Sequence, residues 1–266
     1  MNFFFGFASE EISSQIVIPK FNYMGKRILE NSKVISLEPN NLSWKLHFPE
    51  IIENKNFFFI KKKIDNKKIF CLIQKDKIKI YFKDGFIKEL INFENYFDKD
   101  AVEFRSNLKI LIQNGGYSSY QSDYNFNMCN KVGDILSPLS TLLNINAEQN
   151  FIIFRNISTK PLIKSFRYFF ICKKTKKILH QGKIWSNYSN KINVYKEFIQ
   201  DSVYFFSESL IGIPIYVSIK DGHVSMEHTH PPHQYILSAD KFKVINNLKK
   251  EFKKILEDNL VLSEKN

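Results

Sequence analysis

The chain has few cysteines and no long apolar run, and each absence excludes a class of protein. Its three cysteines, Cys71, Cys129 and Cys172, are far apart and show no CxxC spacing, which argues against a disulfide framework and favours buried thiols in a reducing compartment. No segment reaches the roughly 18 consecutive apolar residues of a transmembrane helix. The apolar start near Phe3 lacks the basic flank of a secretory signal. The sequence therefore predicts a cytoplasmic protein without a membrane span.

Arginine and the common catalytic motifs are also scarce. Lysine and arginine together number 39 and give a formal charge of +12, but only Arg27, Arg105, Arg155 and Arg167 are arginines. Recognition of bases and phosphates depends on the arginine fork, whereas the lysines alternate with isoleucine and phenylalanine as on a solvated sheet face. We therefore expect no specific nucleic-acid partner. The chain has no GxSxG, P-loop or GxGxxG motif, so the usual signatures of serine hydrolases and nucleotide-binding proteins are missing.

Apolar residues are plentiful, at 44% of the chain, and most of them fall in strand-like runs. Residues 1–56 show no clear pattern, and we expect an irregular region with a short helix near 10–15. From Asn56 onward, alternating runs separated by tight turns predict a four-stranded antiparallel meander. Its strands would be 57–64, 68–74, 77–83 and 86–91.

A second series of apolar runs follows, with turn signals about every 8 to 12 residues and no intervening helical pattern, which is typical of a sandwich or barrel. The predicted strands are 108–112, 151–157, 163–172, 177–185, 191–195, 203–207, 213–219 and 223–230. Helical spacing over 238–259 then predicts an amphipathic helix packed on a sheet.

These patterns together predict a mainly β protein, an antiparallel β-sandwich or open barrel with a preceding β-meander and a C-terminal amphipathic helix. We expect an N-terminal region over 1–107 and a sandwich-like domain over 108–266. Whether the two form one continuous domain stays open, as does the oligomeric state.

Four of the six histidines fall between residues 223 and 233, and this clustering is the main chemical signal. In a strand, His228 and His230 share one face, and their Cα atoms lie about 6 to 7 Å apart, so both rings can reach one ion. His233 follows Pro231-Pro232 and would fold over as a third ligand. Three neutral nitrogens suit a divalent transition metal, Zn or Fe, rather than Mg or Ca.

Two further residues of the cluster, Glu227 and His223, project from the opposite face of the predicted strand. We assign them to a second shell or to the general base of a metal-dependent enzyme with hydrolytic or oxygen chemistry. The alternative is that the histidines are structural and cap the strand end.

The same segment resembles the first metal motif of cupins, in which a glycine is followed after five residues by His-x-His and then by an acidic ligand. Gly222, His228 and His230 match this pattern. The acidic position falls on Gln234, and no further histidine follows His233 to form a second motif. The resemblance is therefore confined to the first motif.

A polar segment over 114–124 offers a second candidate site. It is rich in glycine, serine and asparagine and carries Tyr117, Tyr120 and Tyr124, whose flat rings suit a small molecule or glycan. This favours a different class, a non-catalytic binding or assembly module with a glycan or protein partner. The alternative is an ordered surface loop whose tyrosines pack back on the sheet.

Overall fold

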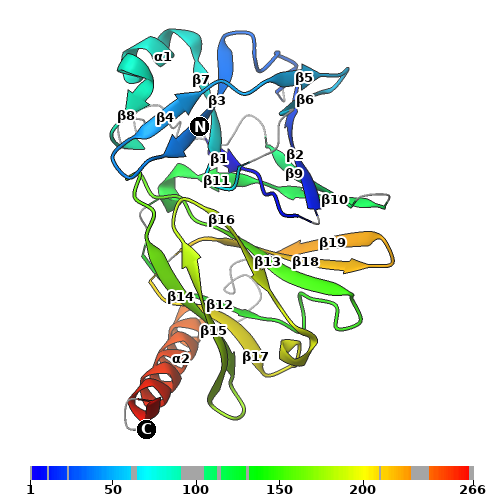
Figure 1. Cartoon of the computed structure of the whole chain (residues 1–266), viewed down its shortest axis with the longest axis vertical. Helices are drawn as coiled ribbons and strands as arrows, with labels where there is room; N and C mark the ends of the chain where they lie inside the picture. Colours follow the sequence, from blue (N-terminus) through cyan, green and yellow to red (C-terminus); the bar gives the residue numbers. More distant parts are fainter. Residues whose placement is uncertain are drawn as a thin grey trace.

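A computed structural model describes residues 2–10, 12–22, 24–60, 65–90, 105–112, 115–129, 132–209, 211–228 and 240–263. These residues form a mainly β protein with four antiparallel sheets and a long C-terminal helix (Figure 1). The architecture agrees with the predicted antiparallel β-sandwich or open barrel with a C-terminal helix.

Two four-stranded sheets form a sandwich in the second half of the chain. Their strands are β12 (Ile135–Pro138), β13 (Gln149–Arg155), β14 (Ser165–Cys172), β15 (Lys177–Trp185), β16 (Ser189–Asn193), β17 (Val203–Ser207), β18 (Ile213–Lys220) and β19 (His223–His228). One sheet has the order β12-β17-β14-β15 and the other β16-β13-β18-β19. Phe154, Phe170, Phe205 and Tyr216 pack between them.

The sheet that contains β13 and β18 is buried on both faces. Phe154 and Tyr216 face the sandwich core, while Phe151, Ile153 and Val217 face the N-terminal half of the chain. This burial explains why both strands read as nearly continuous apolar runs instead of alternating ones. The N-terminal half lies above the sandwich in Figure 1.

The N-terminal half contains the other two sheets. Their strands are β1 (Asn2–Phe5), β2 (Ile12–Pro19), β3 (Ser32–Pro39), β4 (Trp44–His47), β5 (Ile51–Glu53), β6 (Phe57–Ile60), β7 (Ile69–Gln74), β8 (Phe86–Ile87), β9 (Asn107–Ile112), β10 (Tyr117–Gln121) and β11 (Asp123–Asn125). The sheet orders are β11-β1-β7-β3-β4-β8 and β10-β9-β2-β6-β5. Phe4 and Phe70 of the first sheet pack against Ile16 and Phe58 of the second.

The predicted meander is wrong, because its segments do not pair with one another in sequence order. β6 pairs with β2 and β5, whereas β7 pairs with β1 and β3. The segment predicted as its third strand belongs mostly to the short helix α1 (Lys75–Tyr81). Asp76 favours a helix start there, and Ile78 and Tyr81 share a helical face that packs on a core. The alternation of lysine and isoleucine has the period of a strand, and in the helix it leaves Ile80 58% exposed while Ile78 packs on the core.

The expectation of an irregular region over 1–56 is also wrong, since β1 to β5 lie there. The phenylalanines of β1 are buried on both sides, so the strand carries no alternation. The predicted helix near 10–15 falls largely within β2. The strands after residue 107 complete the N-terminal sheets, because β9 pairs with β2 and β11 pairs with β1.

The helix α2 (Lys241–Ser263) covers the outer face of the sandwich, as the sequence predicts. Phe252, Ile255 and Leu256 are buried against Phe169 and Phe206. Burial of each large apolar side chain contributes about 1.5 to 3 kcal/mol, so these three residues hold the helix in place. None of the described helices combines the length and apolarity needed to cross a lipid bilayer.

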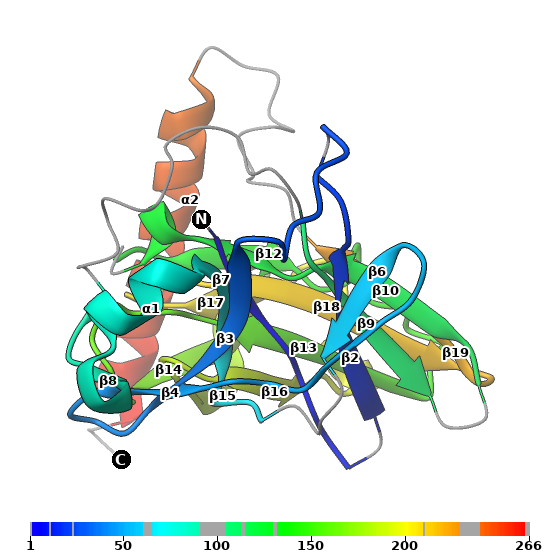
Figure 2. The same cartoon turned by 90° about the horizontal axis from the view of Figure 1, so that it is seen from above.

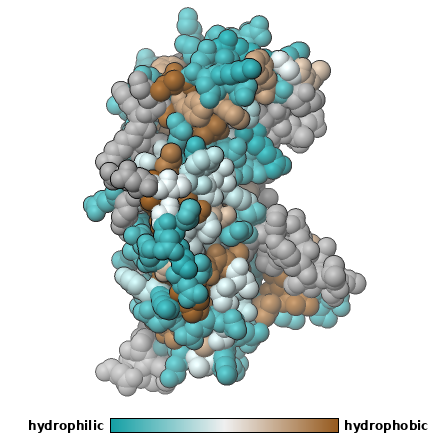
Figure 3. Space-filling model, turned by 90° about the vertical axis from the view of Figure 1, so that its right-hand side faces the viewer, coloured by the Kyte–Doolittle hydropathy of each residue, from teal (hydrophilic) through white to brown (hydrophobic). Residues whose placement is uncertain are grey.

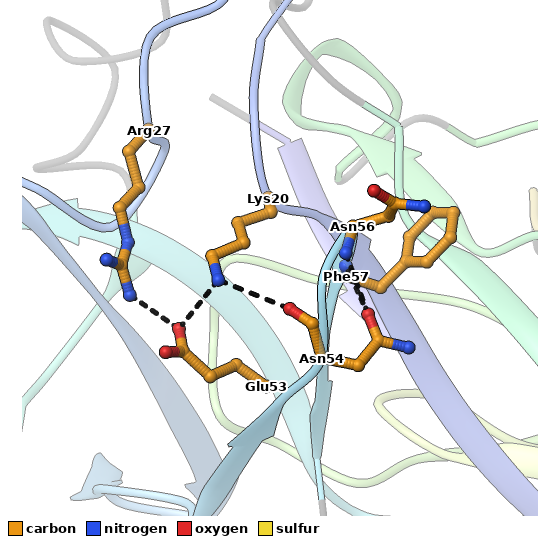
Figure 4. A network of polar contacts seen from close by, with 6 residues as sticks. All are labelled: Lys20, Arg27, Glu53, Asn54, Asn56 and Phe57. Atoms are coloured by element: carbon orange, nitrogen blue, oxygen red, sulfur yellow. Dashed lines mark hydrogen bonds and ion pairs between the residues drawn. The ribbon is translucent and has the colours of Figure 1, made fainter.

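A surface network of polar contacts ties the segment between β2 and β3 to the β5–β6 hairpin (Figure 4). Glu53 Oε2 lies 2.5 Å from Arg27 Nη2 and 3.5 Å from Lys20 Nζ, and Lys20 also donates to the carbonyl of Asn54 at 3.2 Å. The Asn54 side chain accepts hydrogen bonds from two backbone N–H groups of the hairpin turn. Exposed ion pairs of this kind contribute about 0 to 1 kcal/mol each, so the network anchors a loop rather than forming a reactive site.

Candidate functional site

The histidine-bearing strand β19 forms a tight hairpin with β18. Lys220 pairs with His223 across a two-residue turn. Asp221 and Gly222 in this turn have φ of 49° and 72°. Two positive φ values suit the right-handed twist of a hairpin and explain Asp-Gly at these positions. The strands predicted over 213–219 and 223–230 are therefore confirmed over their described residues, and they form a hairpin.

His228 ends the described part of β19 on the face that meets the N-terminal half. It shares this face with Met226, which is buried in the core formed by both halves. The His228 side chain is half-buried, and its ring centre lies 4.5 Å from that of Tyr120 on β10, with the planes tilted by 48°. β10 lies beside β19 in both views of the chain (Figures 1 and 2).

The two residues assigned to a second shell or a general base lie elsewhere. Glu227 and His223 are exposed, and both project from the face of β19 opposite to His228. His223 is five residues away from His228, which corresponds to about 16 Å along a strand. The structure therefore does not bring His223 or Glu227 together with His228.

The remaining predicted ligands, His230 and His233, lie outside the described residues. Among the residues that are described, no group of three or more His, Cys, Asp or Glu side chains is arranged to hold a metal ion. His228 is thus the one predicted ligand whose surroundings the structure describes. Figure 3 shows the right-hand side of the molecule, where the coloured surface is largely hydrophilic with small apolar areas.

The tyrosine-rich segment is not a loop, because most of it forms β10 and β11. Tyr117 is 65% exposed, and Lys109 Nζ lies 3.7 Å from the centre of its ring. Tyr120 is half-buried beside His228, and Tyr124 is fully buried. Burial also raises the pKa of Tyr124. The three tyrosines therefore do not form one binding surface. The sequence analysis missed these two strands because they are rich in polar residues. Both lie at sheet edges.

A backbone contact between two hairpins holds β10 against β19. Gly116 N–H donates to the carbonyl of Gly222 at 2.7 Å. A Cβ atom on Gly115 would lie only 2.4 Å from the same carbonyl oxygen, so a side chain there would force the backbones apart. The Gly115-Gly116 pair was visible in the sequence, but its partner hairpin was not.

A buried acid lies close to this region and was missed by the sequence analysis. Asp123 accepts hydrogen bonds from Ser106 N and Oγ at 3.1 and 2.9 Å and from Gln121 Nε2 at 2.9 Å. Burial raises the pKa of Asp123, and these hydrogen bonds oppose the shift. Because its oxygens already have donors, Asp123 joins β11 to the neighbouring strands rather than serving as a free catalytic acid.

Cys71 and Cys172 are buried, as the sequence predicts, whereas Cys129 is only half-buried. Burial raises the pKa of Cys71 and of Cys129 to about 12. At Cys172 burial opposes ionisation, but hydrogen bonds from Ser202 and Thr175 outweigh it and lower the pKa to about 7. Cys172 is therefore the thiol with the greatest tendency to ionise.

His180 lies apart from the histidine cluster and has a structural role. Its Nε2 lies 3.2 Å from the hydroxyl of Tyr168, and its ring packs beside Phe170 and Phe198. No protein-family model, curated protein or solved structure matches this chain, so its function is inferred from its own residues and their geometry.

Proposed function

We propose that this chain binds a divalent transition metal, Zn or Fe, through His228, His230 and His233. The observation that carries the proposal is the position of His228. Its half-buried imidazole ends β19 beside Tyr120, where the two halves of the chain meet. A ligand at such a junction is partly shielded from water, and neighbouring elements fix its ring orientation.

The spacing of the three histidines supports a common ion. If β19 continues by two residues, His230 lies on the same face as His228. A set of three neutral nitrogens leaves a coordination position open for water or a substrate. Zinc in such a site lowers the pKa of bound water and supplies a nucleophile, whereas iron would bind oxygen. The metal that is present would therefore decide between hydrolytic and oxygen chemistry on a small molecule.

The general-base assignment changes in this proposal. Glu227 and His223 face away from His228, so neither is given a direct role at the ion. Tyr120 takes their place as the side chain next to the proposed site, since its ring contacts that of His228. A phenol in this position would orient the imidazole or donate a hydrogen bond to a metal-bound ligand.

Metal analysis of protein purified without a His tag tests the proposal. We expect one Zn or Fe per chain, and His228→Ala should weaken the affinity by more than about 100-fold, since loss of outer contacts alone costs 10- to 100-fold. His223→Ala is the matched control, because it removes an exposed imidazole from the opposite face of the same strand. Its metal content should equal that of the unchanged protein.

Two results would contradict the proposal. The first is the absence of stoichiometric metal from the unchanged protein, even after reconstitution with Zn²⁺ or Fe²⁺. The second is an equal loss of affinity in His223→Ala and His228→Ala, which would indicate nonspecific binding by surface histidines. Cobalt substitution adds an independent readout, because its visible spectrum reports the ligand set.

A cytoplasmic location belongs to the same proposal. Cys71, Cys129 and Cys172 are all free, and free thiols are typical of proteins in a reducing compartment.

A further inference from the structure

Arg155, the last residue of β13, carries a charge into the interior between the two halves of the chain. Its side chain is 0% exposed. Nη1 donates to the carbonyl of Asn66 at 2.7 Å and lies 3.4 Å from Ser189 Oγ, and the guanidinium lies 6.0 Å from the Phe5 ring centre. Burial lowers the pKa of Arg155 to about 9, so the group still carries its charge at neutral pH.

The other edge of this guanidinium has no hydrogen-bond partner within the described ranges of the chain. Nε and Nη2 are buried and make no hydrogen bond to any residue that the structure describes. These two nitrogens form the side of the arginine fork that binds both oxygens of a carboxylate in parallel. No described carboxylate lies within 4.0 Å of them. Asp65 influences the charge from farther away, but it is exposed and accepts the N–H of Lys67.

Two more buried polar atoms, on Tyr124 and Asn156, make no hydrogen bond of normal geometry with the residues that the structure describes. The hydroxyl of Tyr124 comes from β11, in the N-terminal half, and its side chain is 0% exposed. Burial raises the pKa of Tyr124, whereas the backbone of Ile157, the charge of Arg155 and the side chain of Asn156 oppose this shift, so the phenol lies among these three groups. Asn156 follows Arg155 directly, and its buried Oδ1 accepts no hydrogen bond of normal geometry from the described part of the chain, while its amide nitrogen donates to the carbonyl of Ile211.

The unsatisfied atoms define the chemistry of a missing partner. A buried charge without a counter-ion strongly destabilises a fold. The fork requires a planar anion with two coplanar oxygens, and the Tyr124 hydroxyl is a third donor. Asn156 Oδ1 requires a donor from the same partner. A small carboxylate-type anion with one hydroxyl group meets all three requirements, and bicarbonate is the smallest such anion.

We propose that Arg155, Tyr124 and Asn156 form a buried site for a small carboxylate-type anion, with bicarbonate as the simplest ligand. The anion neutralises the guanidinium and bridges the N-terminal half, through Tyr124, to the sandwich, through Arg155. It acts as an integral part of the core, comparable to a buried structural ion. The site shares no residue with the histidine cluster, so it does not depend on metal binding.

The test uses the full chain, refolded from denaturant in carbonate-free buffer so that the closed site starts empty. Thermal unfolding is then measured at constant ionic strength with increasing bicarbonate, formate or chloride. A ligand that binds only the folded state raises the melting temperature in proportion to the logarithm of its concentration. We expect this rise with bicarbonate, a smaller one with formate, which offers Asn156 no donor, and none with chloride.

Variants identify the site. Arg155→Met should abolish the response, and Arg155→Lys should restore little of it, because lysine lacks the fork. Tyr124→Phe should weaken the apparent affinity about fivefold, the loss expected for one hydrogen bond. Arg167→Met is the control, since Arg167 is half exposed on β14 and should leave the response unchanged. His228→Ala should also respond normally, which separates this site from the metal.

Equal responses to bicarbonate and chloride would overturn the proposal, and so would the absence of any response. Equal responses would indicate a nonspecific effect of anions, and the absence of a response would mean that water satisfies the buried atoms. If Arg155→Met does not fold, Tyr124→Phe decides, because it removes only a hydroxyl. An unchanged bicarbonate affinity in Tyr124→Phe would exclude this hydroxyl from the site and so overturn the bridge between the two halves.

Discussion

The rings of Tyr120 and His228 contact each other with centres 4.5 Å apart, although the two residues come from different halves of the chain. Tyr120 lies on an edge strand of an N-terminal sheet, and His228 lies on an edge strand of the sandwich. Over their described residues the two strands do not pair through backbone hydrogen bonds, so their hairpin turns and side chains hold them together. The candidate site therefore depends on how the two halves pack.

The hairpin contact predicts that Gly115→Ala destabilises the protein. The new Cβ would lie 2.4 Å from the Gly222 carbonyl oxygen, and backbone atoms must move to relieve the clash. We expect a loss of about 1 to 3 kcal/mol in the free energy of unfolding, measured with urea, as for other overpacked positions. Gly116→Ala is the control, since its nearest contacts would be at 3.5 Å. Equal effects at both glycines would argue against this packing.

The ring contact predicts an energetic coupling between Tyr120 and His228. A double-mutant cycle with Tyr120→Ala and His228→Ala should give a coupling of about 0.5 to 1.5 kcal/mol, the range for aromatic pairs. Tyr120→Phe keeps the ring and should retain most of this energy. The same cycle with Tyr117→Ala should give none, because Tyr117 is 65% exposed and contacts Lys109. A coupling energy near zero between Tyr120 and His228 would mean that these two rings do not hold the two halves together.

The sandwich strands could be predicted from the sequence because turns and apolar runs mark them clearly. β15 and β17 begin and end at the predicted residues, and α2 follows its helical period. The N-terminal half could not be predicted in this way. β1 is too fully buried to alternate, and the lysine–isoleucine alternation in α1 indicates a strand although the segment is helical. Pairing between distant strands, such as β9 with β2, leaves no local signal.

The candidate site was predictable only in part. Periodicity placed His228 on one face of β19 and placed Glu227 on the other, and both placements are confirmed. Tyr120 could not be linked to His228, because their contact depends on tertiary packing between the two halves. The buried Arg155 was equally hidden, since a single arginine at the end of an apolar strand resembles an exposed residue.

The cysteine environments predict selective alkylation in the native protein. Hydrogen bonds that lower the pKa of Cys172 to about 7 keep a large share of it as thiolate near neutrality, and the thiolate is the reactive form. Cys71 and Cys129, with pKa raised to about 12, should react only after unfolding. Mass spectrometry after brief iodoacetamide treatment should find the label on Cys172 first. Cys172→Ser should remove the fast phase, and faster labelling of Cys71 would contradict the prediction.

The buried carboxyl of Asp123 predicts a specific dependence of stability on pH. Burial raises its pKa above the ordinary value of 3.8, so the folded state binds the proton more tightly than the unfolded state. Its contribution to stability is therefore fully present below about pH 4 and is lost as the pH rises through the raised native pKa.

Asp123→Asn cannot ionise and should remove this part of the pH dependence. The difference in free energy of unfolding between the unchanged protein and Asp123→Asn should shift against the unchanged protein as the pH rises from about 4, because ionisation of the buried carboxyl destabilises only the former. Urea unfolding at a series of pH values measures this difference, with Asp76→Asn as a control at an exposed aspartate. A difference that stays constant over the whole range, or that moves in favour of the unchanged protein, would mean that hydrogen bonds from Ser106 and Gln121 outweigh the cost of burial.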